Sequence, residues 1–233
     1  MEATLTTDSH IAHDSQAFWR AFYARHALNH AASPFAQWCL SEYLSPQHRL
    51  LELGCGNGRD SFTFIKSGIR VLATDGCDVA ITDNRAQLAA MQDPTKSRFV
   101  NQDLGRIAQL TDTCHGWFDG HQRINAIYSR FFLHAVPQPV EDSIIAFCKE
   151  HLPSGGIMLH EFRTTRDPLM QKGEALSENE RWTDHYRRFI DASNLREQLI
   201  AQGWEVLYFV ESSGLAVFGS EDPVVARIVA RKP

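Results

Sequence analysis

The chain has 233 residues, of which 43% are hydrophobic and 22% are charged, and its formal net charge is −5 at pH 7. These values are ordinary for a folded globular protein and exclude disordered and collagen-like chains. The excess of acidic residues argues against nucleic acid as a partner, because phosphate binding relies on lysine and arginine. No segment has the composition of a membrane helix or a secretory leader, so we expect a cytoplasmic protein without a membrane partner.

The length favours one large α/β domain over residues 1–233. The sequence predicts no oligomeric state. Its cysteines include no C-x-x-C pair, so it predicts neither a disulfide framework nor a metal site. These cysteines are Cys39, Cys55, Cys77, Cys114 and Cys148.

The first residues, 1–45, predict a helical N-terminal arm. The stretch "QAFWRAFYARHALN" (16–29) places aromatic residues on adjoining helical faces. Ser33 followed by Pro34 is a typical start for a second helix, because serine caps the first backbone amides and proline tolerates the first turn.

From residue 48 onward, short apolar runs alternate with helical periodicity, which is typical of βαβ units. The predicted strands are 48–54, 69–76, 97–104, a fourth that breaks into a loop within 124–136, 157–162, and a closing antiparallel pair at 204–212 and 224–232. The predicted helices between them are 58–68, 78–91, 140–156 and 194–202.

A polar, charge-dense segment interrupts this alternation and predicts a lid or a disordered loop, placed at 163–193. Its basic side chains could clamp a carboxylate or phosphate, although long charged loops are usually just solvated. They are Arg163, Arg166, Arg181, Arg187 and Arg188, with His185 among them.

The stretch "LLELGCGNGRD" (50–60) places glycines between a strand and a helix start. Such a turn lets a ligand lie against bare backbone, where a Cβ at Gly54 or Gly56 would block close approach. The spacing does not fit the dinucleotide pattern G-x-G-x-x-G. Glu52 would repel a pyrophosphate and suits a cationic or amine-bearing ligand, although it could also be an ordinary strand-end acid.

Two further acids follow the next strands. Asp75 ends "VLATDG", where a carboxylate can accept hydrogen bonds from ribose hydroxyls. Asp103, after the third strand, is placed to accept from an adenine amino group or, alternatively, to cap a short helix. Adenine, ribose and a cationic tail together indicate S-adenosylmethionine.

The motif "ELGCGNG", the acid Asp75, "NQD" and "AIYSRFFLHAV" together resemble the class I S-adenosylmethionine-dependent methyltransferases over about residues 45–160. "HYRRFI" and "EDPVVARIVARK" are similar to a bacterial small-molecule subgroup. The resemblance implies an α/β, Rossmann-like three-layer sandwich with a mainly parallel seven-stranded sheet and an antiparallel C-terminal strand. It also implies that the glycine turn holds the amino-acid tail, Asp75 the ribose and Asp103 the adenine.

These arguments give a set of expected cofactor-binding residues and three catalytic candidates. His134 and Tyr186 are candidate bases, although His134 could equally be a buried structural histidine. Tyr23 could belong to an aromatic wall that attracts a sulfonium, although aromatic residues at helical spacing are more often part of the core. The expected cofactor contacts are Glu52, Gly54, Cys55, Gly56, Asn57, Gly58, Asp60, Asp75, Gly76, Asp103, Leu104, Ser129 and Arg130.

Three functions fit this pattern, and a shared fold does not decide among them. The first is methyl transfer to a small, anionic metabolite in a biosynthetic pathway. The second is cyclisation of S-adenosylmethionine to azetidine-2-carboxylate with release of methylthioadenosine. The third is a non-catalytic protein that binds S-adenosylmethionine.

Overall fold

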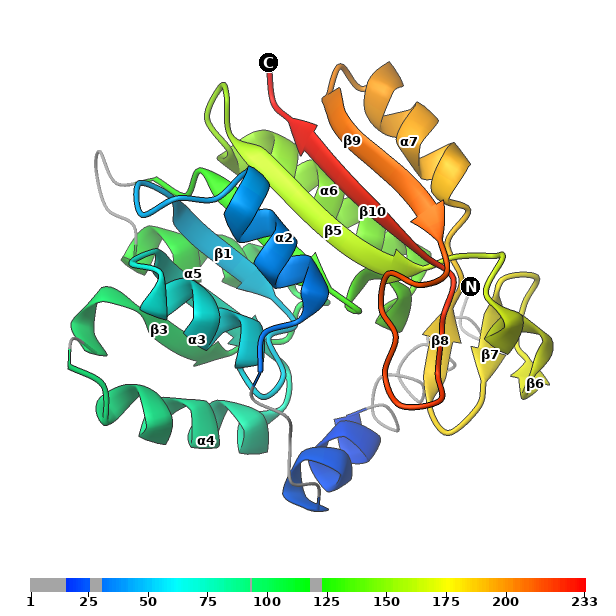
Figure 1. The fold of residues 1–233 in the computed structure, drawn as a ribbon, viewed down its shortest axis with the longest axis horizontal. Helices are drawn as coiled ribbons and strands as arrows, with labels where there is room; N and C mark the ends of the chain where they lie inside the picture. Colours follow the sequence, from blue (N-terminus) through cyan, green and yellow to red (C-terminus); the bar gives the residue numbers. More distant parts are fainter. Residues whose placement is uncertain (1–15, 26–30, 93, 118–122) are drawn as a thin grey trace.

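The computed structural model describes residues 16–25, 31–92, 94–117 and 123–233 (Figure 1). Its centre is a seven-stranded sheet in the order β3-β2-β1-β4-β5-β10-β9. The strands are β1 Arg49–Leu53, β2 Arg70–Asp75, β3 Arg98–Asn101, β4 Ala126–Arg130, β5 Ile157–Arg163, β9 Glu205–Ser212 and β10 Val225–Arg231. Strands β1 to β5 pair in parallel, and β10 runs antiparallel to both β5 and β9. The predicted sheet and its closing antiparallel pair are confirmed.

Helices cover both faces of the sheet and make the three layers. They are α2 Pro34–Glu42, α3 Arg59–Lys66, α4 Asp78–Ala89, α5 Ile107–Trp117, α6 Gln138–His151 and α7 Ala192–Ala201. Side chains of α2, α3 and α4 form one buried cluster with one face of the sheet, and α5, α6 and α7 form the other cluster with the opposite face. Successive strand residues point to opposite faces, so Leu50 lies in the first cluster and Leu51 in the second. This double burial explains why the strands read as continuous apolar runs.

The strand order reverses between β1 and β4, because β2 and β3 lie on one side of β1 while β4 and β5 lie on the other. In open α/β sheets, ligands bind at the carboxyl ends of the strands at such a point. The glycine-rich turn that follows β1 is therefore at the position where this fold binds ligands.

The charge-dense segment folds into ordered structure with its own small antiparallel sheet. This sheet consists of β6 Glu174–Ala175, β7 Glu180–Trp182 and β8 Tyr186–Arg188, after the short helix η3 Pro168–Gln171. The Arg181 guanidinium donates to four backbone carbonyls, those of Met170, Ser177, Glu178 and Glu180. The segment is not a disordered loop, because its own arginine holds its turns together. Its action as a lid stays a prediction.

The helical N-terminal arm is found where the structure describes it. Residues 16–25 form a helix, here called the N-terminal helix, and α2 follows with Ser33 as its cap, since the Ser33 hydroxyl accepts from the Ala36 amide at 3.0 Å. Residues 1–15 and 26–30 of the predicted arm lie outside the described residues. Figure 1 shows the N-terminal helix and the small sheet on the side toward which the parallel strands point.

A buried carboxylate joins three elements near the glycine turn. Asp60, in the first turn of α3, accepts from the Ser33 amide at 2.7 Å, from the Ser33 hydroxyl at 2.8 Å and from the Tyr128 hydroxyl at 2.8 Å. Asp60 is 3% exposed. The carboxylate thus fixes α2 and β4 to α3, and its expected contact with a cofactor stays a prediction.

We expect Asp60→Ala to lower the free energy of unfolding by about 3 kcal/mol, because it leaves buried donors on Ser33 and Tyr128 without an acceptor. Urea denaturation measures this loss. Asp112→Ala, at an exposed position on α5, serves as the control. Equal losses in the two variants would contradict the structural role of Asp60.

A second buried polar contact lies inside the opposite layer. The Ser129 hydroxyl and the His160 Nδ1 atom are 2.7 Å apart on the adjacent strands β4 and β5, and both side chains are fully buried. Among the described residues, His160 Nε2 has no hydrogen-bond partner. Burial lowers the pKa of His160 to about 4. Ser129 is therefore engaged within the core, and its expected cofactor contact gains no support.

We expect stability to be lost as the pH falls below about 6.5, the ordinary histidine pKa, because the unfolded chain then binds a proton that folded His160 rejects. Between pH 7 and pH 5, the wild type loses about 2 kcal/mol more unfolding free energy than His160→Asn. Urea denaturation at both pH values measures the difference. The exposed control His115→Asn should behave like the wild type; a wild-type loss no larger than that of His160→Asn would overturn the expectation.

Candidate functional site

The turn after β1 is built from glycines in a left-handed conformation. The φ angles are 71° at Gly54, 51° at Gly56 and 72° at Gly58, and only glycine adopts such values at little cost. The amides of Gly54 and Cys55 donate to the Thr74 carbonyl on β2, and α3 begins directly after the turn. Backbone conformation is thus one physical reason for the glycine motif.

Protein side chains fill the space beside each of these glycines. A Cβ at Gly54 would lie 2.7 Å from Phe132 Cδ2, and one at Gly56 would collide with the Tyr23 hydroxyl. A Cβ at Gly58 would lie 2.7 Å from Asn84 Oδ1. The bare backbone was expected to make room for a ligand, and in the structure it also makes room for these protein side chains.

Asp75 lies at the carboxyl end of β2 and joins two loops. One carboxylate oxygen accepts from the Gly56 amide at 2.8 Å, and the other accepts from the Cys77 amide at 2.8 Å. Burial raises the pKa of Asp75, and these two hydrogen bonds oppose the rise. A carboxylate has about four acceptor positions, so this one is held rigidly while retaining capacity for ligand hydroxyls. The exposed Gly76 follows it and leaves this edge open.

Glu52 lies beneath the turn. It is 3% exposed, and its carboxyl group accepts from the Ser61 hydroxyl. Burial, together with the neighbouring Asp60, raises the pKa of Glu52 well above its ordinary value. Cys55 is also buried under the turn, while Asn57 is half-buried within it. A direct contact between Glu52 and a ligand amine is therefore not supported, because the carboxyl group supports α3 from inside.

One residue that supports the turn from a neighbouring helix was not predicted from the sequence. Asn84 is fully buried in α4, and its side-chain nitrogen donates to the Gly56 carbonyl at 2.8 Å. The available signal was a polar residue on the buried side of a helix that carries Ile81 and Leu88. Such a residue needs an internal partner, and the turn provides it.

Asp103 lies in the loop after β3 and is exposed. Its carboxylate accepts from the Gly105 amide at 3.0 Å and forms an ion pair with Arg106 at 3.3 Å. The alternative capping role thus has a local basis, since these contacts order the turn that precedes α5. The neighbouring Leu104 is buried. Contacts between this loop and an adenine stay a prediction.

The carboxyl end of β4 contains a strained residue. Phe131 has a φ angle of 55°, an uncommon value for a bulky side chain, and such strain concentrates at functional sites. The Arg130 guanidinium lies over its ring at 4.2 Å from the centroid and donates to Glu161 at 2.9 Å. His134 lies on the other side of this loop, with its ring centroid 5.3 Å from that of Phe131.

The environment of His134 disfavours its role as a general base. Its Nδ1 atom accepts from the Arg163 amide at 3.1 Å, so the neutral ring carries its proton on Nε2. Burial lowers the pKa of His134 well below the ordinary value, and Arg163, Arg187, His185 and Arg188 lower it further. The imidazole can donate a hydrogen bond from Nε2 but has its basic lone pair engaged.

The N-terminal helix spans the distance between the glycine turn and the small sheet. Tyr23 lies against Gly56, and burial raises the pKa of its hydroxyl, as does the nearby Asp75. The rings of Phe18 and Trp19 contact His185, at centroid distances of 4.4 and 4.7 Å. The helix therefore covers the turn, and its aromatic rings pack together with Tyr23 at the inner end. Their contact with a sulfonium stays a prediction.

The remaining candidates of the small sheet are engaged within the protein. Tyr186 is 1% exposed and donates to Glu180 at 2.5 Å, which fixes β8 to β7. Arg188 donates to Glu141 on α6, and Arg187 donates to Asp184. Of the other arginines, Arg163 is paired with Asp167 and Glu221, Arg166 with Glu211, and Arg181 with backbone carbonyls. The predicted anion clamp gains no support, because each of these cations already has a protein partner.

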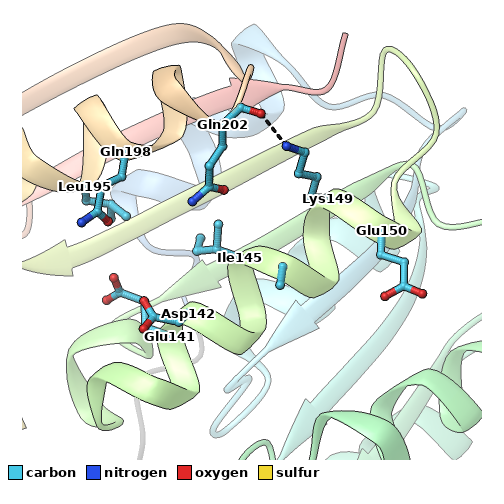
Figure 2. A pocket seen from close by; sticks show the side chains of 9 residues that line it. Glu141, Asp142, Ile145, Lys149, Glu150, Leu195, Gln198 and Gln202 are labelled. Carbon is cyan, nitrogen blue, oxygen red and sulfur yellow. Dashed lines mark hydrogen bonds between the residues drawn. The ribbon is translucent and has the colours of Figure 1, made fainter.

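A groove of about 520 Å³ lies between α6 and α7 (Figure 2). Figure 2 shows Ile145 and Leu195 on its walls, and Lys149 bonded to the Gln202 carbonyl at 2.5 Å. Among its lining residues is no member of the predicted site. We place the functional site at the glycine turn rather than here, because position at the strand ends outweighs the size of a surface groove.

In the described part of the chain, no group of three or more histidine, cysteine or acidic residues is arranged to hold a metal ion. Within the same residues, every helix is too short or too polar to traverse a bilayer.

Known structures with a similar fold include several enzymes of small-molecule chemistry. The glycopeptide N-methyltransferase MtfA, complexed with S-adenosyl-L-homocysteine, has a TM-score of 0.62 and 15% identity over 87% of this chain and 90% of that chain. The 1,6-didemethyltoxoflavin-N1-methyltransferase of Burkholderia thailandensis has a TM-score of 0.65 and 17% identity over 99% of this chain and 89% of that chain. The 4+2 cyclase SpnF has a TM-score of 0.65 and 18% identity over 89% of this chain and 86% of that chain.

No curated protein matched the sequence. A family model described as a methyltransferase domain matches residues 11–208, which include the glycine turn, Asp75 and the carboxyl end of β4. The resemblance seen in the sequence is thereby confirmed, and the chain belongs to the methyltransferase domain family.

Proposed function

We propose that this protein uses S-adenosylmethionine to methylate a small metabolite. The observation that carries the proposal is Asp75, a carboxylate fixed to the glycine turn at the switch point of a methyltransferase-family sheet. The two hydroxyls of a ribose can donate hydrogen bonds to this carboxylate, and the exposed Gly76 beside it leaves room for their approach.

The other residues suit the remaining parts of this cofactor. The backbone of Gly54 to Gly58 offers a turn for the amino-acid tail, and the loop with Asp103 and Leu104 borders the adenine side. When bound, S-adenosylmethionine supplies an electrophilic methyl group on a sulfonium cation. The faces of Tyr23 and its aromatic neighbours attract such a cation by about 0.5–2 kcal/mol.

The protein would promote the reaction by positioning the reactants and excluding water rather than by transferring protons. Tyr23 covers Gly56, so a ligand on the turn must lie against its ring or move it aside. The N-terminal helix, through its contact with His185, would then exclude water from the reacting groups. His134 and Tyr186 have their hydrogen-bonding groups engaged, so we attribute the rate chiefly to alignment of acceptor and methyl group.

The similar structures support a small-molecule acceptor. MtfA acts on a glycopeptide and the toxoflavin enzyme on 1,6-didemethyltoxoflavin, by their names, and both were crystallised with S-adenosylhomocysteine. SpnF is a cyclase by name, so proteins of this fold also include enzymes of other reactions. Cyclisation of S-adenosylmethionine and binding without catalysis are therefore the alternatives that the experiment below must distinguish. An anionic acceptor has lost its main support, since the arginines of residues 163–193 are paired.

Methyl transfer predicts a specific nucleoside product. With methyl-labelled S-adenosylmethionine and a protein-free metabolite extract as the source of acceptors, we expect S-adenosylhomocysteine and a labelled small molecule, both identified by mass spectrometry. Asp75→Asn should slow product formation about tenfold to hundredfold, because it removes charged hydrogen bonds to the ribose. Asp83→Asn, at an exposed position of the neighbouring helix α4, should leave the rate unchanged and controls for the lost charge.

Two other outcomes would replace this assignment. Methylthioadenosine above the uncatalysed background, formed without the extract, would establish cyclisation. Binding of S-adenosylmethionine without either product would establish a binding protein.

A further inference from the structure

A cluster of charged side chains lies between the sheet and the helices α2 and α3. Glu161 is fully buried and accepts from Arg130 at 2.9 Å and from Arg227 at 2.7 Å. Arg59 and Asp60 complete the cluster, with Arg59 Nε 3.9 Å from Asp60 Oδ1. The cluster thus contains three guanidinium groups and two carboxylates, and one positive charge is in excess.

Among these three guanidinium groups, that of Arg59 has the weakest pairing. Asp60 already accepts three hydrogen bonds from Ser33 and Tyr128, and its 3.9 Å separation from Arg59 is too long for a hydrogen bond. Arg59 Nε is buried and has no hydrogen-bond acceptor among the described residues. Its side chain is 21% exposed, so the guanidinium is largely withdrawn from water, and the long ion pair with Asp60 compensates it only in part. Buried polar groups are nearly always bonded, so such an exception calls for an explanation.

The position of Arg59 indicates where an anion that pairs with it would lie. It is the first residue of α3, directly after Gly58, and Arg130 is the last residue of β4. Strand β1 lies between β2, which ends in Asp75, and β4, which ends in Arg130. An anion at Arg59 would therefore lie at the crevice of the switch point, on the side of the turn that carries β4.

We propose that Arg59 binds the α-carboxylate of the S-adenosylmethionine tail. The inference rests on the proposed function and adds to it the residue that recognises the amino-acid end of the cofactor. A guanidinium matches a carboxylate in geometry and charge, and the pair forms strong hydrogen bonds. Arg130 is a positioning residue here, because Glu161 holds it beside the site while its charge adds to the local potential. Glu52, which the sequence argument assigned to the tail, supports the turn from beneath.

Binding of two ligands can distinguish this contact from the other contacts of the site. S-adenosylhomocysteine carries the α-carboxylate, whereas methylthioadenosine shares the nucleoside but lacks the amino-acid group. Isothermal calorimetry with both ligands is carried out on the wild type, Arg59→Gln and Lys66→Gln. Lys66 is an exposed cation in the last turn of the same helix, so its variant controls for the change in net charge.

We expect Arg59→Gln to weaken S-adenosylhomocysteine about tenfold to hundredfold, the loss typical of hydrogen bonds to a charged group, and to leave methylthioadenosine affinity unchanged. Arg59→Lys, which keeps the charge, should recover part of the loss. Lys66→Gln should match the wild type with both ligands.

Unchanged S-adenosylhomocysteine affinity in Arg59→Gln would overturn the inference. Equal weakening of both ligands would also overturn it, because it would show that Arg59 only maintains the shape of the site. If the wild type bound neither ligand, the proposed function itself would fail, and urea denaturation of each variant excludes loss of folding as the cause.

Discussion

The carboxylate of Asp75 is the constraint on which the arrangement of the site depends. It accepts from Gly56 on one loop and from Cys77 on the next, and so fixes the loops after β1 and β2 to each other. The glycine turn makes this possible, because its left-handed backbone directs the Gly56 amide toward β2. Removing the carboxylate would free both loops together. The ligand surface at the switch point therefore depends on one side chain, which is only partly buried.

The acidic residues around this turn have different tasks, and burial separates them. Asp60 and Glu52 are each 3% exposed and are bonded to serine hydroxyls, and Asp60 also to Tyr128. They hold α3 against the sheet, whereas Asp75 faces the loops and keeps acceptor capacity for a ligand. The cations divide in the same way, because Arg130 is paired with Glu161 while Arg59 has no acceptor at Nε. Near the turn, Asp75 can thus accept further hydrogen bonds and Arg59 can donate one. The two residues lie on opposite sides of β1.

The sequence predicted the helices and strands that have a clear hydrophobic periodicity, and the turn that contains the three glycines. The parallel strands, the antiparallel pair β9 and β10, the Ser33 cap and the glycine turn were all recognisable from local pattern. The small sheet was not, because strands of two or three residues are too short to show an alternation. A local sequence pattern also does not show which residues far apart in the chain form ion pairs. The ion pair between Arg188 and Glu141 could therefore not be predicted.

Long-range packing likewise decided the roles of several side chains that the sequence singled out. Nothing local to Tyr23 indicates that its ring reaches Gly56, and nothing local to His134 indicates that the Arg163 amide occupies its basic nitrogen. Glu52 was expected at the ligand because it stands beside the glycines and suits a cationic group, yet its side chain turns inward to Ser61. Residue type and position at a strand end predicted the neighbourhood of the site, but the direction of each side chain depended on which neighbours filled the space.

We propose above all that Asp75 holds the ribose of the ligand at the switch point of the sheet. A crystal structure of the protein with S-adenosylhomocysteine tests this proposal most directly. We expect both ribose hydroxyls within hydrogen-bond distance of the Asp75 carboxylate, with the amino-acid tail along the glycine turn. A ligand whose ribose lies away from Asp75, or one bound in the groove between α6 and α7, would contradict it.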